Sequence, residues 1–142
     1  MEFNKCPCYG SNLDKLIQPM ILIILAQEVL YGYKIVQRLA ESPMCKGPKP
    51  DGTGVYRFLK AMEQRNLVKS SWSLDDSGPA KRIYHITNEG KDCLSHWIDT
   101  LEDYRQAIGK MLEEAHMVYD KTTRSSERKT SLTWRGINDG EK

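Results

Sequence analysis

Near the C-terminal end of the chain, apolar residues recur alternately three and four positions apart. They are Leu94, Trp97, Leu101, Tyr104, Ile108, Met111 and Ala115. This heptad spacing is typical of a helix that packs lengthwise on another helix. The alternative is a helix that lies across the core of its own domain. Because the pattern is sustained over three heptads, we expect two copies of the chain to pair, with these residues at the dimer interface.

Three segments with a helical pattern precede this seam. Residues 13–29 are expected to form the first helix, with Pro19 either as a kink or as its first residue. The run after Pro19 is apolar all round, which predicts that this helix is buried on most sides. Tyr33–Glu41 has one apolar face and ends before Pro43. The third segment follows a loop rich in proline and glycine. It closes at Asn66, a residue that tolerates the left-handed conformation of a helix C-terminus.

After Asn66 the hydrophobic period changes from helical to alternating. The first alternating run contains Val68, Ser70, Trp72 and Leu74, and the second is KRIYHIT, residues 81–87. The turn formers of DDSGPA separate them, so a β-hairpin is predicted. Thr87 is placed to cap the final helix. The expected fold class is mainly α with a small β-hairpin wing, a winged helix-turn-helix followed by a long C-terminal dimerisation helix.

These patterns divide the chain into four parts. We expect residues 1–12 to be a flexible leader that contains cysteines, and residues 13–89 to form a winged helix-turn-helix DNA-binding domain. Residues 90–117 are expected to form a dimerisation helix, and residues 118–142 a disordered tail.

Charge is unevenly distributed, although the net charge is only +2. Residues 1–90 carry 12 Lys and Arg against 9 Asp and Glu, whereas residues 91–115 carry 3 against 6. A basic front part and an acidic section suggest different tasks. The most apolar run, Pro19–Ala26, is far shorter than the roughly 20 residues that cross a bilayer. No signal peptide is recognisable, so we expect a cytoplasmic protein without a membrane partner.

A helix-turn-helix places its second helix in the major groove of DNA, and the wing contacts the backbone. Thr53, Arg57, Lys60 and Gln64 share one face of the third helical segment, bordered by Tyr56. Such side chains contact bases and phosphates, although each alone could belong to an ordinary solvated face. Further candidate DNA contacts are Lys34, Gly54, Lys69, Lys81 and Arg82. Glycines at the start of this helix would let its backbone approach a phosphate closely.

Three stretches resemble PadR-family transcriptional regulators: YGYKI at 31–35, GVYRFLKAMEQRNLV at 54–68 and AKRIYHITNEG at 80–90. The resemblance covers about Leu13 to Ala115. It implies a cytoplasmic dimer, usually a repressor, that is paired through its C-terminal helix and releases double-stranded operator DNA when a small molecule binds. It also implies that Trp97 and Tyr104 could hold a small aromatic effector, although packing alone would explain them. Gly54 stands where the family usually has Thr.

The remaining chemistry-bearing residues give weaker signals. Cys6, Cys8 and Cys45 could bind a metal or sense redox state, although CPC is not the usual ligand spacing of a zinc site. No cofactor is expected otherwise. The three histidines are scattered along the chain. No nucleophile has a histidine and a carboxylate at a recognisable spacing, so no enzyme is expected. Two alternatives to a DNA-binding dimer therefore stay open: a cysteine-based sensor, and a winged-helix module that binds only proteins.

Overall fold

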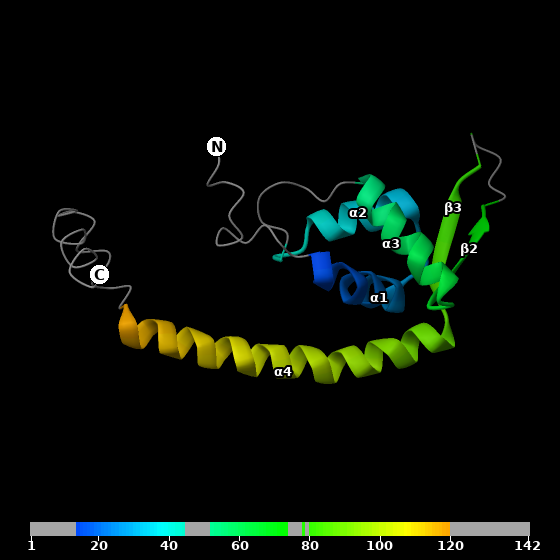
Figure 1. Cartoon of the computed structure of the whole chain (residues 1–142). Coiled ribbons are helices and arrows are strands. Elements are labelled where there is room, and N and C mark those ends of the chain that lie inside the picture. The colour runs from blue at the N-terminus through cyan, green and yellow to red at the C-terminus, as the bar shows by residue number, and fades with distance from the viewer. Residues whose placement is uncertain (1–13, 45–51, 74–77, 79, 120–142) are drawn as a thin grey trace, which may run out of the picture. The chain divides into compact units, whose positions relative to one another are not determined.

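The computed structural model describes residues 14–44, 52–73, 78 and 80–119 of the 142 residues. Its elements are a 3-10 turn (Asp14–Leu16), α1 (Ile17–Gln27), β1 (Leu30–Tyr31), α2 (Gly32–Ala40), α3 (Gly52–Gln64), β2 (Val68–Trp72), β3 (Arg82–Ile86) and α4 (Asn88–Val118). Figure 1 labels the α-helices and the two longer strands. The predictions for the leader, for Cys6, Cys8 and Cys45, and for the tail beyond Tyr119 lie outside the described residues. The mainly helical fold class with a winged helix is confirmed.

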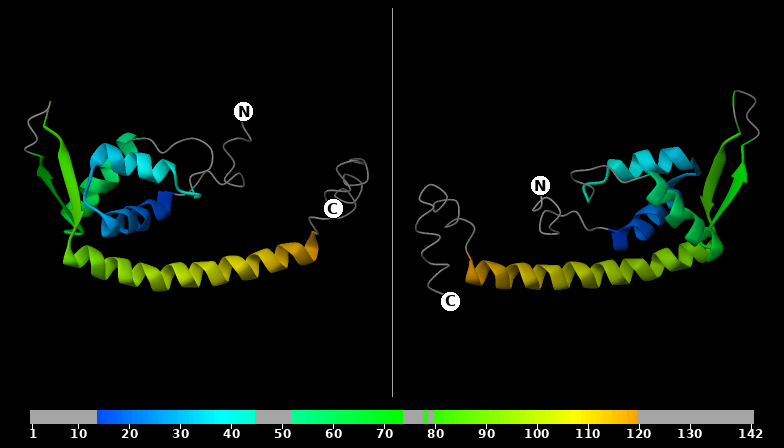
Figure 2. Two further views of the ribbon diagram at one scale, coloured as in Figure 1. Left: turned by 180° about the vertical axis from the view of Figure 1, so that it is seen from behind. Right: turned by 45° about the horizontal axis from the view of Figure 1, so that its top comes forward.

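The chain divides into two compact units, residues 1–98 and 99–142. The first unit contains α1–α3, the sheet and the first turns of α4. The rest of α4 belongs to the second unit. Within the first unit, α1, α2 and α3 lie together and the β2–β3 hairpin stands beside α3 (Figure 2).

One apolar cluster holds the first unit together. Its fully buried members come from α1, α2, α3 and β2: Ile21, Leu22, Ile35, Leu39, Leu59, Met62 and Val68. Burying each such side chain contributes about 1.5–3 kcal/mol. On α3 the buried residues Val55, Leu59 and Met62 recur at helical spacing, so this face is fixed against the core and the opposite face is turned outward.

The sheet has three antiparallel strands in the order β1-β3-β2. In the β2–β3 pair, Ser70 lies opposite Tyr84 and Trp72 lies opposite Arg82. The hairpin was predicted, but β1, which lies between the first two expected helices, was not. Leu30–Tyr31 is only two residues long and pairs with β3, more than fifty positions away, so no local period could reveal it.

Pro19 is the third residue of α1 and not its first. In the first turn of a helix the N–H groups have no intrahelical acceptor, so the missing N–H of proline costs no hydrogen bond there. The side chain is buried in the core. The proline therefore fits inside the helix where the sequence suggested an interruption.

The end of α3 confirms the role expected of Asn66, whose φ is 63°. The N–H of Leu67 donates to the Met62 carbonyl at 2.9 Å, and that of Asn66 donates to Glu63 at 3.0 Å. This pair of bonds is the Schellman arrangement, which satisfies carbonyls that the helix leaves free. It turns the chain directly from α3 into β2.

Thr87 caps α4 as predicted. Its hydroxyl oxygen accepts a hydrogen bond from the N–H of Gly90 at 2.9 Å. The same hydroxyl lies 2.6 Å from the carbonyl oxygen of Asn66 and 3.0 Å from that of Leu67. The start of α4 is thereby attached to the turn between α3 and β2.

Candidate nucleic-acid interface

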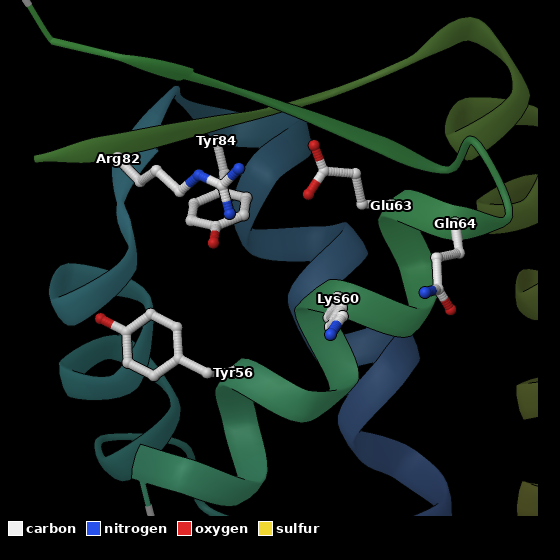
Figure 3. A pocket seen from close by; sticks show the side chains of 6 residues that line it. All are labelled: Tyr56, Lys60, Glu63, Gln64, Arg82 and Tyr84. Atoms are coloured by element: carbon white, nitrogen blue, oxygen red, sulfur yellow. The ribbon is translucent and has the colours of Figure 1, made fainter.

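An open groove of about 550 Å³ lies between α3 and β3. Four side chains of α3 and two of β3 line it: Tyr56, Lys60, Glu63, Gln64, Arg82 and Tyr84 (Figure 3). The core-facing side of α3 is anchored, so the groove-facing side chains start from a rigid backbone. Ligand sites in proteins commonly have volumes of several hundred cubic ångströms. The size and the mixed polar and aromatic lining suit a ligand or a strand of nucleic acid.

The guanidinium group of Arg82 is held between aromatic side chains. It lies 5.4 Å from the ring centroid of Trp72, its cross-strand neighbour. Burial raises the pKa of Tyr84, whereas the charge of Arg82 and a hydrogen bond with it lower that pKa. Figure 3 shows the guanidinium group beside Tyr84. Arg82 is thus positioned at the wall of the groove, where a planar cation can bind phosphate.

Glu63 places a carboxylate in the same groove, and the sequence analysis did not single it out. The hydroxyl of Ser70 donates a hydrogen bond of 2.8 Å to Glu63 Oε2, which ties α3 to β2. A carboxylate repels phosphate but can accept a hydrogen bond from the amino group of cytosine. Spacing could have revealed it, because Tyr56, Lys60 and Glu63 follow one another at i, i+4 and i+7. Trp72, which is 59% exposed, was also missed.

The predicted DNA contacts fall into separate groups. Tyr56, Lys60, Gln64 and Arg82 are brought together in the groove. Thr53 and Arg57 are exposed on α3 and Lys69 is exposed on β2, but none of these lines the groove. Lys34 and Lys81 both lie beside the ring of Tyr33.

Gly52 and Gly54 lie in the first turn of α3. A Cβ added at Gly52, the first residue of α3, would meet nothing within 4 Å. Gly54 is partly exposed. Packing within the chain therefore does not require glycine at position 52.

The heptad residues of α4 lie in different surroundings. Leu94 and Trp97 are partly buried against the core of the first unit. In the second unit Leu101 is partly buried, whereas the remaining members of the seam are exposed: Tyr104 47%, Ile108 60%, Met111 63% and Ala115. The two residues expected to hold an effector thus differ, since Trp97 packs against the core and Tyr104 is open.

Cys93 is a free, partly buried thiol. Among residues 14–44, 52–73 and 80–119, no three His, Cys, Asp or Glu side chains gather in a way that could hold a metal ion. Over the same described ranges, no helix is both long and apolar enough to span a bilayer.

A family model described as the transcriptional regulator PadR-like family matches residues 21–96, which is more than half of the chain. The chain belongs to the PadR-like family. The matched span includes the whole groove. It ends before Tyr104, so all of the exposed heptad residues lie beyond it.

Solved structures of PadR-like proteins share this fold. A PadR family transcription regulator from hypervirulent Clostridium difficile is 31% identical, with a TM-score of 0.60 over 68% of this chain and 98% of that one. A transcriptional regulator from Thermoplasma acidophilum is also 31% identical, with a TM-score of 0.62 over 71% and 94%. PadR from Bacillus subtilis, solved in complex with operator DNA, is 22% identical and has a TM-score of 0.52 over 58% and 45%. The last likeness bears on the fold alone.

A curated relative has a similar description. A probable transcriptional regulator from Mycobacterium tuberculosis is 28% identical over 96 residues, which make up 67% of this chain. Those residues make up 50% of the relative, so this PadR-like chain spans about half of its length.

Proposed function

We propose that this PadR-like protein binds double-stranded DNA and regulates transcription. In this proposal α3 enters the major groove, and the β2–β3 hairpin, the wing, lies along the backbone. The observation that supports it best is the groove in which Tyr56, Lys60, Gln64 and Arg82 lie together. α3 and the wing thus contribute hydrogen-bond donors to one surface, where a single DNA duplex can contact both.

The residues of the proposed interface can make two kinds of contact, with phosphates and with bases. Lys60 can bind phosphate or the edge of guanine, and Gln64 can pair with adenine. Arg82, braced by Trp72, suits a phosphate at the wall. Arg57, exposed on the same helix, adds a second cation that can reach a base. This set combines binding that does not depend on sequence with reading of bases.

Substitutions on α3 test the proposal in a mobility-shift assay with DNA from the promoter of the gene itself or of adjacent genes. Arg57→Ala and Lys60→Ala should each weaken binding by about five- to a hundredfold. If a residue reads a base, the loss will be confined to the operator, whereas loss of a phosphate contact will be similar on all sequences. Lys110→Ala, which removes an exposed charge from α4, is the matched control. Unchanged shifts with both α3 variants would exclude this reading face.

The proposed regulator acts as a homodimer paired through α4. The exposed seam residues Tyr104, Ile108 and Met111 support this, because apolar side chains at heptad spacing are covered when two helices pack together. Ile108→Lys with Met111→Lys should convert the dimer to a monomer in sedimentation equilibrium. Asp103→Lys introduces the same side chain at an exposed position outside the seam and should leave the dimer intact. A monomeric wild type would exclude this pairing.

We further propose that the protein represses transcription in the cytoplasm and releases DNA when a small planar aromatic molecule binds near Trp97 and Tyr104. Aromatic side chains stack well on flat ligands. A planar aromatic dye titrated against the protein should lose affinity when Tyr104→Ala and Trp97→Leu are introduced. A reporter under the native promoter should rise when the gene is deleted. Falling expression in that strain would identify an activator.

A further inference from the structure

A second cluster of cations and aromatic rings lies beside the groove. The rings of Tyr31 and Tyr33 are stacked, with centroids 5.8 Å apart and an interplanar angle of 11°. Lys81 Nζ lies 5.7 Å from the Tyr31 centroid and 5.6 Å from the Tyr33 centroid. Lys34 Nζ lies 5.9 Å from the Tyr33 centroid. Two ammonium groups therefore converge on one tyrosine ring.

The rings are themselves held by the sheet. Tyr31 pairs with Ile83 of β3, and its hydroxyl forms a 3.3 Å hydrogen bond with the hydroxyl of Ser73, next to the end of β2. The platform, by which we mean Tyr31 and Tyr33, thus connects the start of α2 to the far end of the wing. It presents a fixed aromatic face to the two lysines.

The positive charge of the two lysines is not neutralised by a carboxylate in the described part of the chain, where the salt bridges are Arg38–Glu28 and Arg105–Glu102. Lys34, Lys81 and Tyr33 are all exposed. Two cations that both lie within about 6 Å of one ring centroid make this surface positive, and an anion bound beside them is attracted by both. Among the described residues no carboxylate fills this place, so an anion from outside the chain can bind there.

The position of the platform indicates which anion that is. A Cβ added at Gly32, between the two tyrosines, would lie 2.5 Å from the ring of Tyr56, which lines the groove. Lys81 and Arg82 are adjacent, and side chains alternate along an extended strand, so Lys81 points to the platform when Arg82 points to the groove. A polyanion that occupies the groove can therefore continue onto the platform.

We propose that Lys34 and Lys81 bind a backbone phosphate of the DNA and that Tyr31 and Tyr33 are positioning residues, which hold these ammonium groups ready for it. This inference rests on the proposed DNA binding and adds a phosphate site with two positioning residues. A free lysine loses rotamer freedom when it binds phosphate. A lysine already placed over two rings loses less, so the rings strengthen binding without touching the DNA.

Tyr33 variants of the full chain test the platform. Tyr33→Leu should weaken binding about three- to tenfold on operator and unrelated DNA alike, because ordering of a long side chain adds to the cost of binding. Tyr33→Phe keeps the ring and should bind like the wild type. The slope of log affinity against log salt should fall by about one when Lys81→Gln is introduced. In DNA-free protein, NMR should show upfield ring-current shifts of the Lys81 side-chain protons that Tyr33→Leu removes.

A double-mutant cycle separates positioning from structural damage. In the Lys34→Gln, Lys81→Gln background, Tyr33→Leu should cause no further loss of affinity. The positioning role is overturned if Tyr33→Leu causes the full loss of affinity in that background, or if Tyr33→Leu alone binds DNA like the wild type. In either case the proposed function stands if Arg57→Ala still weakens DNA binding. If the wild type binds no DNA at low salt, both the inference and the proposed function fail.

Discussion

The hydroxyl of Thr87 donates a hydrogen bond of 2.6 Å to the carbonyl oxygen of Asn66, a residue 21 positions earlier in the chain. The contact joins the first residue before α4 to the residue that reverses the chain after α3. α3, the wing and the start of α4 therefore meet at one point, and substitutions there affect all three.

We expect Thr87→Ala to lower the free energy of unfolding by about 1–2 kcal/mol, because it removes both an N-cap and a hydrogen bond to the turn. Thr87→Ser keeps the hydroxyl and should lose much less. Urea denaturation followed by circular dichroism measures both. Equal stabilities of the Ala and Ser variants would show that the hydroxyl does not matter.

Two glycines of α4 should respond to alanine in opposite directions. A Cβ at Gly90 would overlap the backbone oxygen of Leu67 and lie 2.7 Å from Ile86, so Gly90→Ala should destabilise the fold by about 1–3 kcal/mol. At Gly109 a Cβ would meet nothing within 4 Å, so Gly109→Ala should stabilise the helix by about 0.5–1 kcal/mol. The Tm values of the two variants, compared with that of the wild type, test this contrast. Similar shifts of Tm in one direction would refute the contrast.

Gly32 and Gly52 each begin a helix and form a second matched pair. Gly32→Ala places a methyl group against Tyr56, whose exposed ring can swing away, so DNA affinity should fall about three- to tenfold with little loss of stability. Gly52→Ala meets open space in the free protein. If it also weakens DNA binding, the backbone at the start of α3 approaches the DNA closely. Binding assays and melting curves, run in parallel, separate these effects.

Removing the negative charge of Glu63 should raise the affinity for unrelated DNA, because its carboxylate lies in the groove beside Lys60 and Arg82. Glu63→Gln keeps an acceptor for Ser70, so α3 and β2 stay joined. Discrimination between operator and unrelated DNA should shrink by about five- to a hundredfold if Glu63 reads a base. Competition binding measures the ratio. An unchanged ratio would leave Glu63 with only its bond to Ser70.

Burial raises the pKa of Tyr84 above 10.0 in the folded state, so the free energy of unfolding should fall at high pH. The unfolded phenol ionises first, so the contribution of Tyr84 is complete below the unfolded pKa, about 10, and is lost as pH rises through the folded one. The difference in free energy of unfolding between the wild type and Tyr84→Phe should be smaller at about pH 11 than at about pH 8. A difference that is constant with pH would contradict this.

Local patterns predicted most of the fold. The apolar spacing of α3, the left-handed Asn66 and the alternation after it gave the helix, its closure and the wing. The same patterns placed Lys60 and Gln64 on one face of α3 with Tyr56 at its border, whereas Thr53 and Arg57, expected on that face, do not line the groove. Where a property depends on the nearest few residues, the sequence was sufficient.

Properties that depend on distant partners could not be predicted in this way. β1 forms only because Leu30 and Tyr31 pair with β3, and Lys81 lies beside Tyr31 only because the sheet brings these two segments together. Each of these contacts joins segments whose separation along the chain conceals their proximity.

Gly32 and Gly90 leave different freedom for related sequences to diverge. The crowding at Gly32 comes from the side chain of Tyr56, so a relative with a smaller residue at that position could accept alanine at 32, and the two positions should covary. The crowding at Gly90 comes largely from the main-chain oxygen of Leu67, which every amino acid supplies. No second substitution can compensate there, so glycine at position 90 should persist even among relatives that differ in their wings and in the DNA they bind.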